Sequence, residues 1–124
     1  MAGRNVLSEK ELATADLLKR AGMQSVVAKV VVVLARGDEI VSVKIEGLTE
    51  LRQPEVSIAM RELVRKKWAK RRSIRKPGKG RPLNGYVLCV KLADIVAELD
   101  SAQKKKAQEM EHTMSRLRRI AKGK

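Results

Sequence analysis

The segment from residue 91 to residue 121 contains no proline and no glycine, and it is rich in Ala, Leu, Glu, Lys and Gln. This composition predicts one helix of about 30 residues, roughly 45 Å long at about 1.5 Å per residue. The whole chain has 124 residues, which is enough for one small domain plus one extension. Because so small a domain cannot bury such a helix, we expect a second copy of the chain to cover it.

Apolar side chains recur at helical spacing along this predicted helix, and the run from Lys104 to Lys106 interrupts them. We expect these side chains, together with a first helix at residues 9–21, to build a homodimer interface. The residues predicted to face the second copy are Leu92, Ile95, Val96, Leu99, Met110, Met114, Leu117 and Ile120.

Positive charge is concentrated between Arg61 and Arg81. Eleven residues of this segment are Lys or Arg and only Glu62 is acidic, so it carries +10 of the formal net charge of +14. Residues 1–60, in contrast, are net neutral. A folded segment with this much positive charge favours a polyanionic partner, and nucleic acid is the leading candidate.

Local patterns predict the elements of the neutral half. Ser8 and Glu11 form a capping box, which predicts the start of the helix at residues 9–21. Residues 25–36 have a broad apolar stripe at helical spacing, which favours a second helix. The run of β-branched valines in this segment leaves a buried strand as an alternative. Residues 39–41 are read as a short strand or an extended link.

Two further helices are predicted on either side of a short turn. Ser42 is a candidate N-cap for a short helix that runs through Leu48. The next helix spans about residues 53–67 and begins at Gln53, with Pro54 at its first helical position, where the missing N–H costs nothing.

A β-hairpin is predicted after Trp68, where the helical period is lost. Its strands are residues 69–76 and 85–90, and residues 77–82 (Pro-Gly-Lys-Gly-Arg-Pro) form a basic tip. Trp68, between the helix and the first strand, and Tyr86 are interpreted as core residues. Two aromatic side chains make a poor stacking platform for bases, which counts against sequence-tolerant binding of single strands. Cys89 lies in the predicted apolar strand at residues 85–90 and is interpreted as a buried, inert thiol.

This order of elements is that of a winged helix-turn-helix domain, an α+β and mostly α fold with a two-stranded basic wing and a long C-terminal dimerisation helix. The sequence resembles prokaryotic, particularly archaeal, winged-helix transcription regulators of the broad MarR, ArsR and TrmB-like group. The resemblance is carried by residues 45–63 (Ile-Glu-Gly-Leu-Thr-Glu-Leu-Arg-Gln-Pro-Glu-Val-Ser-Ile-Ala-Met-Arg-Glu-Leu) and residues 79–82 (Lys-Gly-Arg-Pro), and it covers about residues 24–90. Glu55 and Ile58 depart from the Thr and basic residue that relatives often carry.

The resemblance implies a homodimeric, sequence-specific regulator that binds double-stranded DNA. Its recognition helix, at about residues 53–67, would enter a major groove, and its wing, at about residues 69–90, would contact the minor groove or the backbone. Glu55 could accept a hydrogen bond from cytosine and Ile58 could touch a thymine methyl group. The predicted DNA-binding residues are Ser42, Lys44, Arg52, Gln53, Glu55, Ser57, Ile58, Arg61, Arg65, Arg71, Arg72, Arg75, Lys76, Lys79 and Arg81.

Three domains follow from these patterns: an N-terminal helix at residues 1–22, a DNA-binding domain at residues 23–90, and a dimerisation helix with a basic tail at residues 91–124. We expect no cofactor, no metal site and no catalytic residue, because the chain has one His, one Cys and no phosphate-binding loop. We also expect no signal peptide and no membrane span, and a cytoplasmic, nucleoid-associated protein.

Two other functions remain open at this point. One is a sequence-tolerant architectural or chromatin protein that coats DNA, and the other is an RNA-binding winged-helix module. A weaker alternative is an adaptor whose basic wing meets an acidic protein. The run from Lys104 to Lys106 is equally consistent with a second DNA contact and with a solvated helix face. The sequence does not identify an operator or a small-molecule effector.

Overall fold

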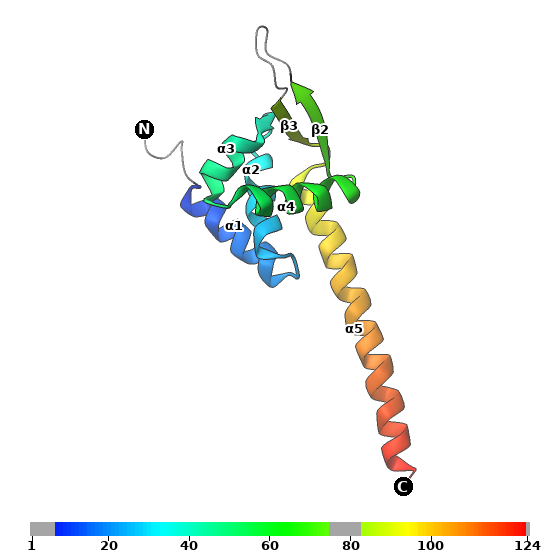
Figure 1. Cartoon of the computed structure of the whole chain (residues 1–124). Helices are drawn as coiled ribbons and strands as arrows, with labels where there is room; N and C mark the ends of the chain where they lie inside the picture. Colours follow the sequence, from blue (N-terminus) through cyan, green and yellow to red (C-terminus); the bar gives the residue numbers. More distant parts are fainter. Residues whose placement is uncertain (1–6, 75–82, 124) are drawn as a thin grey trace.

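The computed structural model describes residues 7–74 and 83–123, which form a mostly helical α+β fold (Figure 1). Within these residues, five helices surround a small three-stranded antiparallel sheet. The elements in chain order are α1 (Glu9–Arg20), α2 (Ser25–Leu34), β1 (Ile40–Val41), α3 (Ser42–Thr49), α4 (Gln53–Arg65), β2 (Ala69–Ile74), β3 (Leu83–Leu88) and α5 (Leu92–Lys122).

The helix α2 is the centre of the hydrophobic core. Val30, Val31, Val33 and Leu34 have no exposed surface, because α1, α3, α4 and β3 pack around this helix. The alternative of a buried strand is therefore wrong for this segment. Burial on all sides overrides the weak helix propensity of valine, which amounts to only a few tenths of a kcal/mol per residue.

The helix α4 begins at Gln53 as predicted, but the capping of α3 and the position of Pro54 in α4 differ by one residue from the prediction. Ser42 is the first residue of α3 and Val41 is its N-cap, so the predicted capping role of Ser42 is wrong. Gln53 is the first residue of α4 and Arg52 is its N-cap, which puts Pro54 at the second helical position.

The helix α4 ends at Arg65, two residues earlier than predicted. Lys67 adopts the left-handed conformation, with φ of 65°, and the N–H of Trp68 donates to the carbonyl of Leu63 at 3.0 Å. This is a Schellman-type helix end in which a lysine occupies the position usually taken by glycine. The turn leads the chain directly into β2.

The three strands have the order β1-β3-β2, so β2 is an edge strand. The register pairs Ala69 with Leu88 and Arg71 with Tyr86. The predicted pair of strands is present with somewhat different bounds, and β1 adds a third strand that pairs with β3. The predicted tip at residues 77–82 lies outside the described residues, as do the predicted DNA-binding residues Arg75, Lys76, Lys79 and Arg81.

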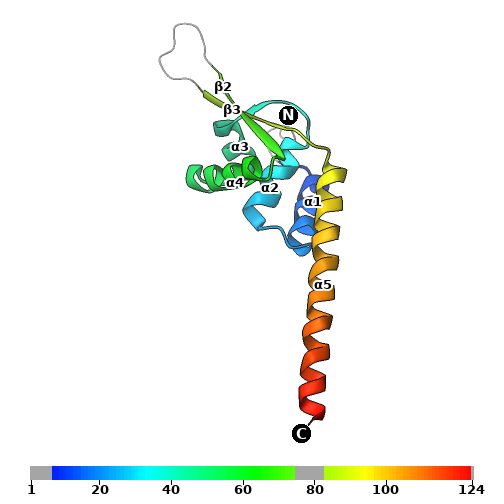
Figure 2. The same ribbon diagram turned by 90° about the vertical axis from the view of Figure 1, so that its right-hand side faces the viewer.

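The helix α5 leaves the globular part of the molecule and runs far beyond it (Figure 1, Figure 2). Near its start, Ile95 has no exposed surface and belongs to the core of its own chain, so it is not available to a second copy as predicted. Leu92 and Leu99 pack against the same core and are half-buried. From residue 100 to residue 123, every residue except Ser115 is exposed.

Other core predictions had mixed outcomes. Trp68 and Tyr86 are buried, as expected, at the junction of α4 with the sheet. Cys89 is exposed, so its interpretation as a buried thiol is wrong: it lies one residue past the end of β3, where the chain turns toward α5. None of the described helices is both long enough and apolar enough to cross a bilayer.

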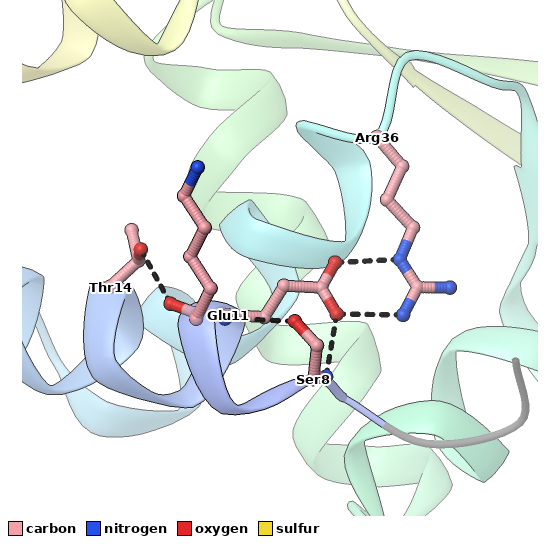
Figure 3. Close-up of polar contacts among 5 residues, drawn as sticks. Ser8, Glu11, Thr14 and Arg36 are labelled. Atoms are coloured by element: carbon pink, nitrogen blue, oxygen red, sulfur yellow. Dashed lines mark hydrogen bonds and ion pairs between the residues drawn. The ribbon is translucent and has the colours of Figure 1, made fainter. Parts of the chain in front are cut away.

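An ion pair ties the start of α1 to the end of α2 (Figure 3). The guanidinium of Arg36 donates from Nε to Glu11 Oε2 at 2.7 Å and from Nη2 to Glu11 Oε1 at 2.8 Å. The same carboxylate accepts from the amide of Ser8, whose hydroxyl accepts from the amide of Glu11, so the predicted capping box is confirmed. The hydrogen bonds from Arg36 and Ser8 together lower the pKa of Glu11 from 4.5 to about 2, against the opposing effect of burial.

Replacing Glu11 with Gln should therefore destabilise the fold in a pH-dependent way. The native pKa lies below the ordinary value, so the contribution of the carboxylate is fully present above about pH 4.5 and is lost as the pH falls toward 2. At pH 7 we expect Glu11→Gln to lower the free energy of unfolding by roughly 1–2 kcal/mol, measured by denaturant titration. The difference from wild type should shrink as the pH falls from 5 toward 2. Glu9→Gln, in the same helical turn, is the control and should change stability little.

Candidate nucleic-acid interface

The helix α4 has one face in the core and one face in solvent. Val56, Ala59, Met60 and Leu63 are buried against the rest of the domain. Gln53, Ile58 and Arg61 are exposed, and Ser57 is half-buried between the two faces. The spacing follows the helical period, so the fold presents this polar and basic face of α4 outward. Figure 1 shows α4 crossing the front of the molecule below β2 and β3.

Glu55, one of the residues predicted to read bases, makes a hydrogen bond within the N-terminal turn of α4. Glu55 Oε1 accepts a hydrogen bond from the backbone amide of Arg52 at 2.9 Å. A carboxylate at this position also complements the positive end of the helix dipole. The predicted hydrogen bond from a cytosine to Glu55 would therefore have to share or replace this interaction. Gln53 lies at the first position of the helix, with its side chain exposed.

A hollow of about 740 Å³ separates the exposed face of α4 from the sheet. Its lining combines cationic and apolar side chains because α4 contributes Ser57, Met60, Arg61 and Val64, while the following turn and strands contribute the rest. The cationic residues that line it are Arg61, Lys67, Lys70 and Arg71. Four of the seven Lys and Arg residues that the structure describes between residues 61 and 74 line this hollow, and we call it the basic hollow.

Two of these four cations were not among the predicted site residues. Lys67 was predicted as the last residue of the helix and Lys70 as part of the following strand, and neither was expected to line a surface shared with α4. The left-handed backbone at Lys67 brings the end of α4 against β2, and this conformation is rare for residues other than glycine, asparagine and aspartate. The alternation of side chains along β2 was no guide either, because it predicts opposite faces of the sheet for Lys70 and Arg71, although both line the hollow.

Several other cations of the segment make contacts within the protein. Arg65 Nη2 lies 2.7 Å from Glu62 Oε2, and this hydrogen bond lowers the pKa of Glu62. Arg72 Nη2 lies 3.3 Å from Glu39 Oε1 in the link before β1. Lys66 Nζ lies 4.6 Å from the centre of the Trp68 ring. These cations are exposed as well, but a polyanion would compete with partners that they already have.

The remaining predicted contacts lie on neighbouring elements. Ser42 and Lys44 are in the first turn of α3, where Lys44 is exposed and Ser42 is half-buried. Arg52 is exposed in the turn between α3 and α4. Val43, which was not predicted, is two-thirds exposed in the first turn of α3. Neither Ser42 nor Lys44 lines the basic hollow.

A hydrogen bond between Trp68 and Glu98 joins this region to α5. The indole N–H of Trp68 donates to Glu98 Oε2 at 2.7 Å. Trp68 is almost fully buried, so its N–H has to find its partner within the protein. Since Trp68 is also the last residue of the connection from α4 to β2, the bond couples the placement of the basic hollow to the placement of α5.

No protein-family model matches this chain, and no curated protein matches it either. Within residues 7–74 and 83–123, no three His, Cys, Asp or Glu side chains gather in a way that could hold a metal ion. What the molecule does is therefore inferred from the charge and geometry of α4, β2 and α5.

Removing the carboxylate of Glu98 should destabilise the junction of α4, β2 and α5. Glu98→Ala leaves the buried indole N–H of Trp68 without an acceptor, which costs roughly 1–3 kcal/mol in the free energy of unfolding. Trp68 is the single tryptophan, so its fluorescence reports the change directly during denaturant titration. Glu98→Gln keeps an acceptor oxygen and should recover most of the loss. Glu109→Ala, farther along the same helix, should leave both stability and emission unchanged.

Proposed function

We propose that this protein is a homodimeric, sequence-specific regulator of transcription that binds double-stranded DNA through a winged helix-turn-helix domain. In this proposal α3 and α4 form the helix-turn-helix, α4 is the recognition helix, and β2 with β3 forms the wing. The single observation that carries the proposal is the basic hollow, where the outward face of α4 and the cations of β2 lie side by side.

The dimensions of the exposed helix favour a major groove. An α-helix with its side chains is about 10–12 Å across, and the major groove of B-DNA is about 12 Å wide. Gln53, Ile58 and Arg61 are exposed on α4 and would face the base edges or the flanking phosphates. Amide and guanidinium groups form the specific pairs that read adenine and guanine, and Ile58 offers a contact for a thymine methyl group.

The cations beside α4 would bind the DNA backbone. Lys70 and Arg71 are exposed on the edge strand β2, and Arg61 lines the same hollow from α4. A duplex seated on α4 would bring its phosphates toward this edge. Each phosphate that a cation neutralises makes the slope of log affinity against log salt concentration steeper, that is, more negative, by about 0.9. Such a surface therefore binds strongly at low salt and holds the duplex while α4 reads the bases.

The aromatic residues favour duplex over single-stranded nucleic acid. Proteins that bind single strands without sequence preference stack bases on exposed aromatic side chains. Trp68 and Tyr86, the two aromatic residues of the chain, are both buried at less than a tenth of their full exposure. A DNA-coating protein and a protein that binds structured RNA would be compatible with the same buried aromatic side chains, so these two alternatives are outcomes of the selection experiment.

Selection of bound duplexes from a random pool tests the proposal. A regulator should enrich one sequence and prefer it over bulk duplex by about 10³-fold or more at physiological salt. Enrichment of no sequence, with tight binding to all duplexes, would support the architectural alternative. Structured RNA outcompeting duplex DNA at matched salt would support the RNA-binding alternative and exclude the proposal.

Neutralising the basic hollow should weaken binding and flatten its salt dependence. For the double variant Arg61→Ala/Arg71→Ala we expect the slope of log affinity against log salt concentration to become less steep by about 1–2, measured by fluorescence anisotropy with the selected duplex. The control variant Lys10→Ala/Lys19→Ala removes the same charge from exposed positions on α1 and should leave the slope nearly unchanged. Equal losses in the two variants would mean that net charge, and not the hollow, governs binding.

A further inference from the structure

The outer half of α5 carries an apolar stripe with nothing in its own chain to cover it. Met110, Met114, Leu117 and Ile120 are each between two-fifths and two-thirds exposed. They continue the same helical face as Val96, closer to the globular part of the molecule. An isolated helical segment of this length is only marginally stable in water. The stripe therefore needs a partner for the helix to persist.

An apolar groove lies along the first half of α5, where α1 runs beside it (Figure 2). Leu17 and Leu18 of α1 and Val96 and Leu99 of α5 line this groove, which has a volume of about 600 Å³. Leu17 is 63% exposed and Val96 is 48% exposed. The groove ends where Gln103 Nε2 donates to the carbonyl of Ala21 at 2.7 Å, and the uncovered stripe begins beyond that point.

Charge is distributed along α5 with a clear polarity. Residues 92–102 contain three acidic side chains and no basic one, namely Asp94, Glu98 and Asp100. Residues 103–122 contain seven basic side chains against Glu109 and Glu111. Asp94 accepts a hydrogen bond from the amide of residue 91, and Glu98 accepts one from Trp68. Both carboxylates still contribute negative charge to this part of the helix. The first part of α5 is thus acidic and the outer part is basic.

We propose that the outer half of α5 from a second copy docks antiparallel into the groove between α1 and α5, and that the exchange is reciprocal. The inference rests on the homodimer of the proposed function and assigns its orientation. Antiparallel pairing sets the basic outer half of each helix against the acidic first part of the other. Parallel pairing would set basic against basic along the outer half, and like charges in such positions oppose assembly.

The apolar pattern supports a specific register for this pairing. In this register, residue 108 of one helix lies at the same level along the axis as residue 108 of the other. Val96 then lies opposite Ile120 of the second copy, and Leu99 lies opposite Leu117 of the second copy. Both layers are apolar and occur twice by symmetry. They also cover the two parts of the surface that are exposed in the single chain: the groove beside α1 and the outer stripe.

Two polar layers lie nearer the centre of this register. Gln103 would oppose Thr113 of the second copy, and a polar layer of this kind fixes the register at some cost in stability. Met110 would oppose Lys106 of the second copy, whose aliphatic stem can lie along the apolar side chain while its ammonium group reaches solvent. The lysine run that interrupts the apolar stripe therefore falls in the middle of the pairing and not at its ends.

The register also separates the two globular parts. Val96 lies about 12 residues from the centre in each copy, so equivalent points are about 36 Å apart along the helix axis at about 1.5 Å per residue. Successive major grooves on one side of B-DNA are about 34–36 Å apart. An antiparallel α5 pair is therefore of the right length to hold two copies of α4 near adjacent turns of one duplex.

Distances between spin labels test the orientation. The full chain would carry Cys89→Ser, so that one introduced cysteine is labelled, at Gln108→Cys or at Lys122→Cys. The antiparallel register places the two labels at 108 at the same level along the axis, on the outward faces of the two helices, so that only the width of the pair, roughly 20–24 Å, separates them. It places the labels at 122 about 14 residues beyond the centre in opposite directions, roughly 42 Å apart along the axis. We expect a short distance at 108 and a long one at 122.

Every other pattern of distances overturns the proposal. Short distances at both positions mean a parallel pair, a long distance at 108 means an interface elsewhere, and no dipolar coupling means a monomer. Duplex binding is measured separately with the same labelled proteins. A parallel pair or a monomer that still selects one duplex sequence leaves the proposed function standing, whereas an antiparallel pair that selects none removes the proposed function alone.

A pair of lysine substitutions on opposite faces of α5 provides the matched control. Leu117→Lys puts a charge into an apolar layer, and we expect the dimer dissociation constant to rise about 100-fold or more by sedimentation. Gln108→Lys introduces the same residue on the outward face and should leave it within about threefold. Both positions are exposed in the single chain, so neither substitution disturbs the core. Equal effects at the two positions would contradict the proposed register.

Discussion

Burial of α2 is the constraint on which the rest of the structure depends. Its valine-rich sequence is apolar on every side, so the chain must surround it, and α1, α3, α4 and the sheet all supply apolar faces to do so. With no phenylalanine and only two aromatic residues, the core is almost entirely aliphatic. Because these elements gather around α2, they lie beside only the first part of α5, and its outer half runs beyond them with exposed side chains (Figure 1).

The burial of α2 also determines where the positive charge lies on the surface. Covering α2 fixes which face of α4 is buried, and the opposite face must then carry the polar residues Gln53 and Arg61 outward. The left-handed turn at Lys67 sends the chain straight from α4 into β2, which sets Lys70 and Arg71 beside that face. The proposed DNA-binding surface thus follows from the way in which α4 and the sheet pack around α2. The hydrogen bond between Trp68 and Glu98 fixes the position of this surface relative to α5.

The two halves of α5 have different roles in this scheme. The first half contributes Ile95 to the core and forms a groove with α1, whereas the outer half is exposed along its whole length apart from Ser115. The opposite charges of the two halves complement the helix dipole within one chain, and in an antiparallel pair they complement each other as well. They are the arrangement expected if each half meets the other half of a second copy, and such a dimer would set the spacing of the two α4 helices on DNA.

The sequence by itself determined the order of the elements and the kind of most of them, because caps, apolar periods and turn residues act over a few neighbouring positions. The capping box at Ser8 and the long helix from residue 92 followed from such local signals. Tertiary structure decided the helical state of α2, the burial of Ile95, the exposure of Cys89 and the use of Glu55 as a helix cap. It also decided which cations line the basic hollow and which, like Arg72, pair with a carboxylate elsewhere in the chain. These outcomes depend on which surfaces meet across long sequence separations, and a local pattern of residues does not contain that information.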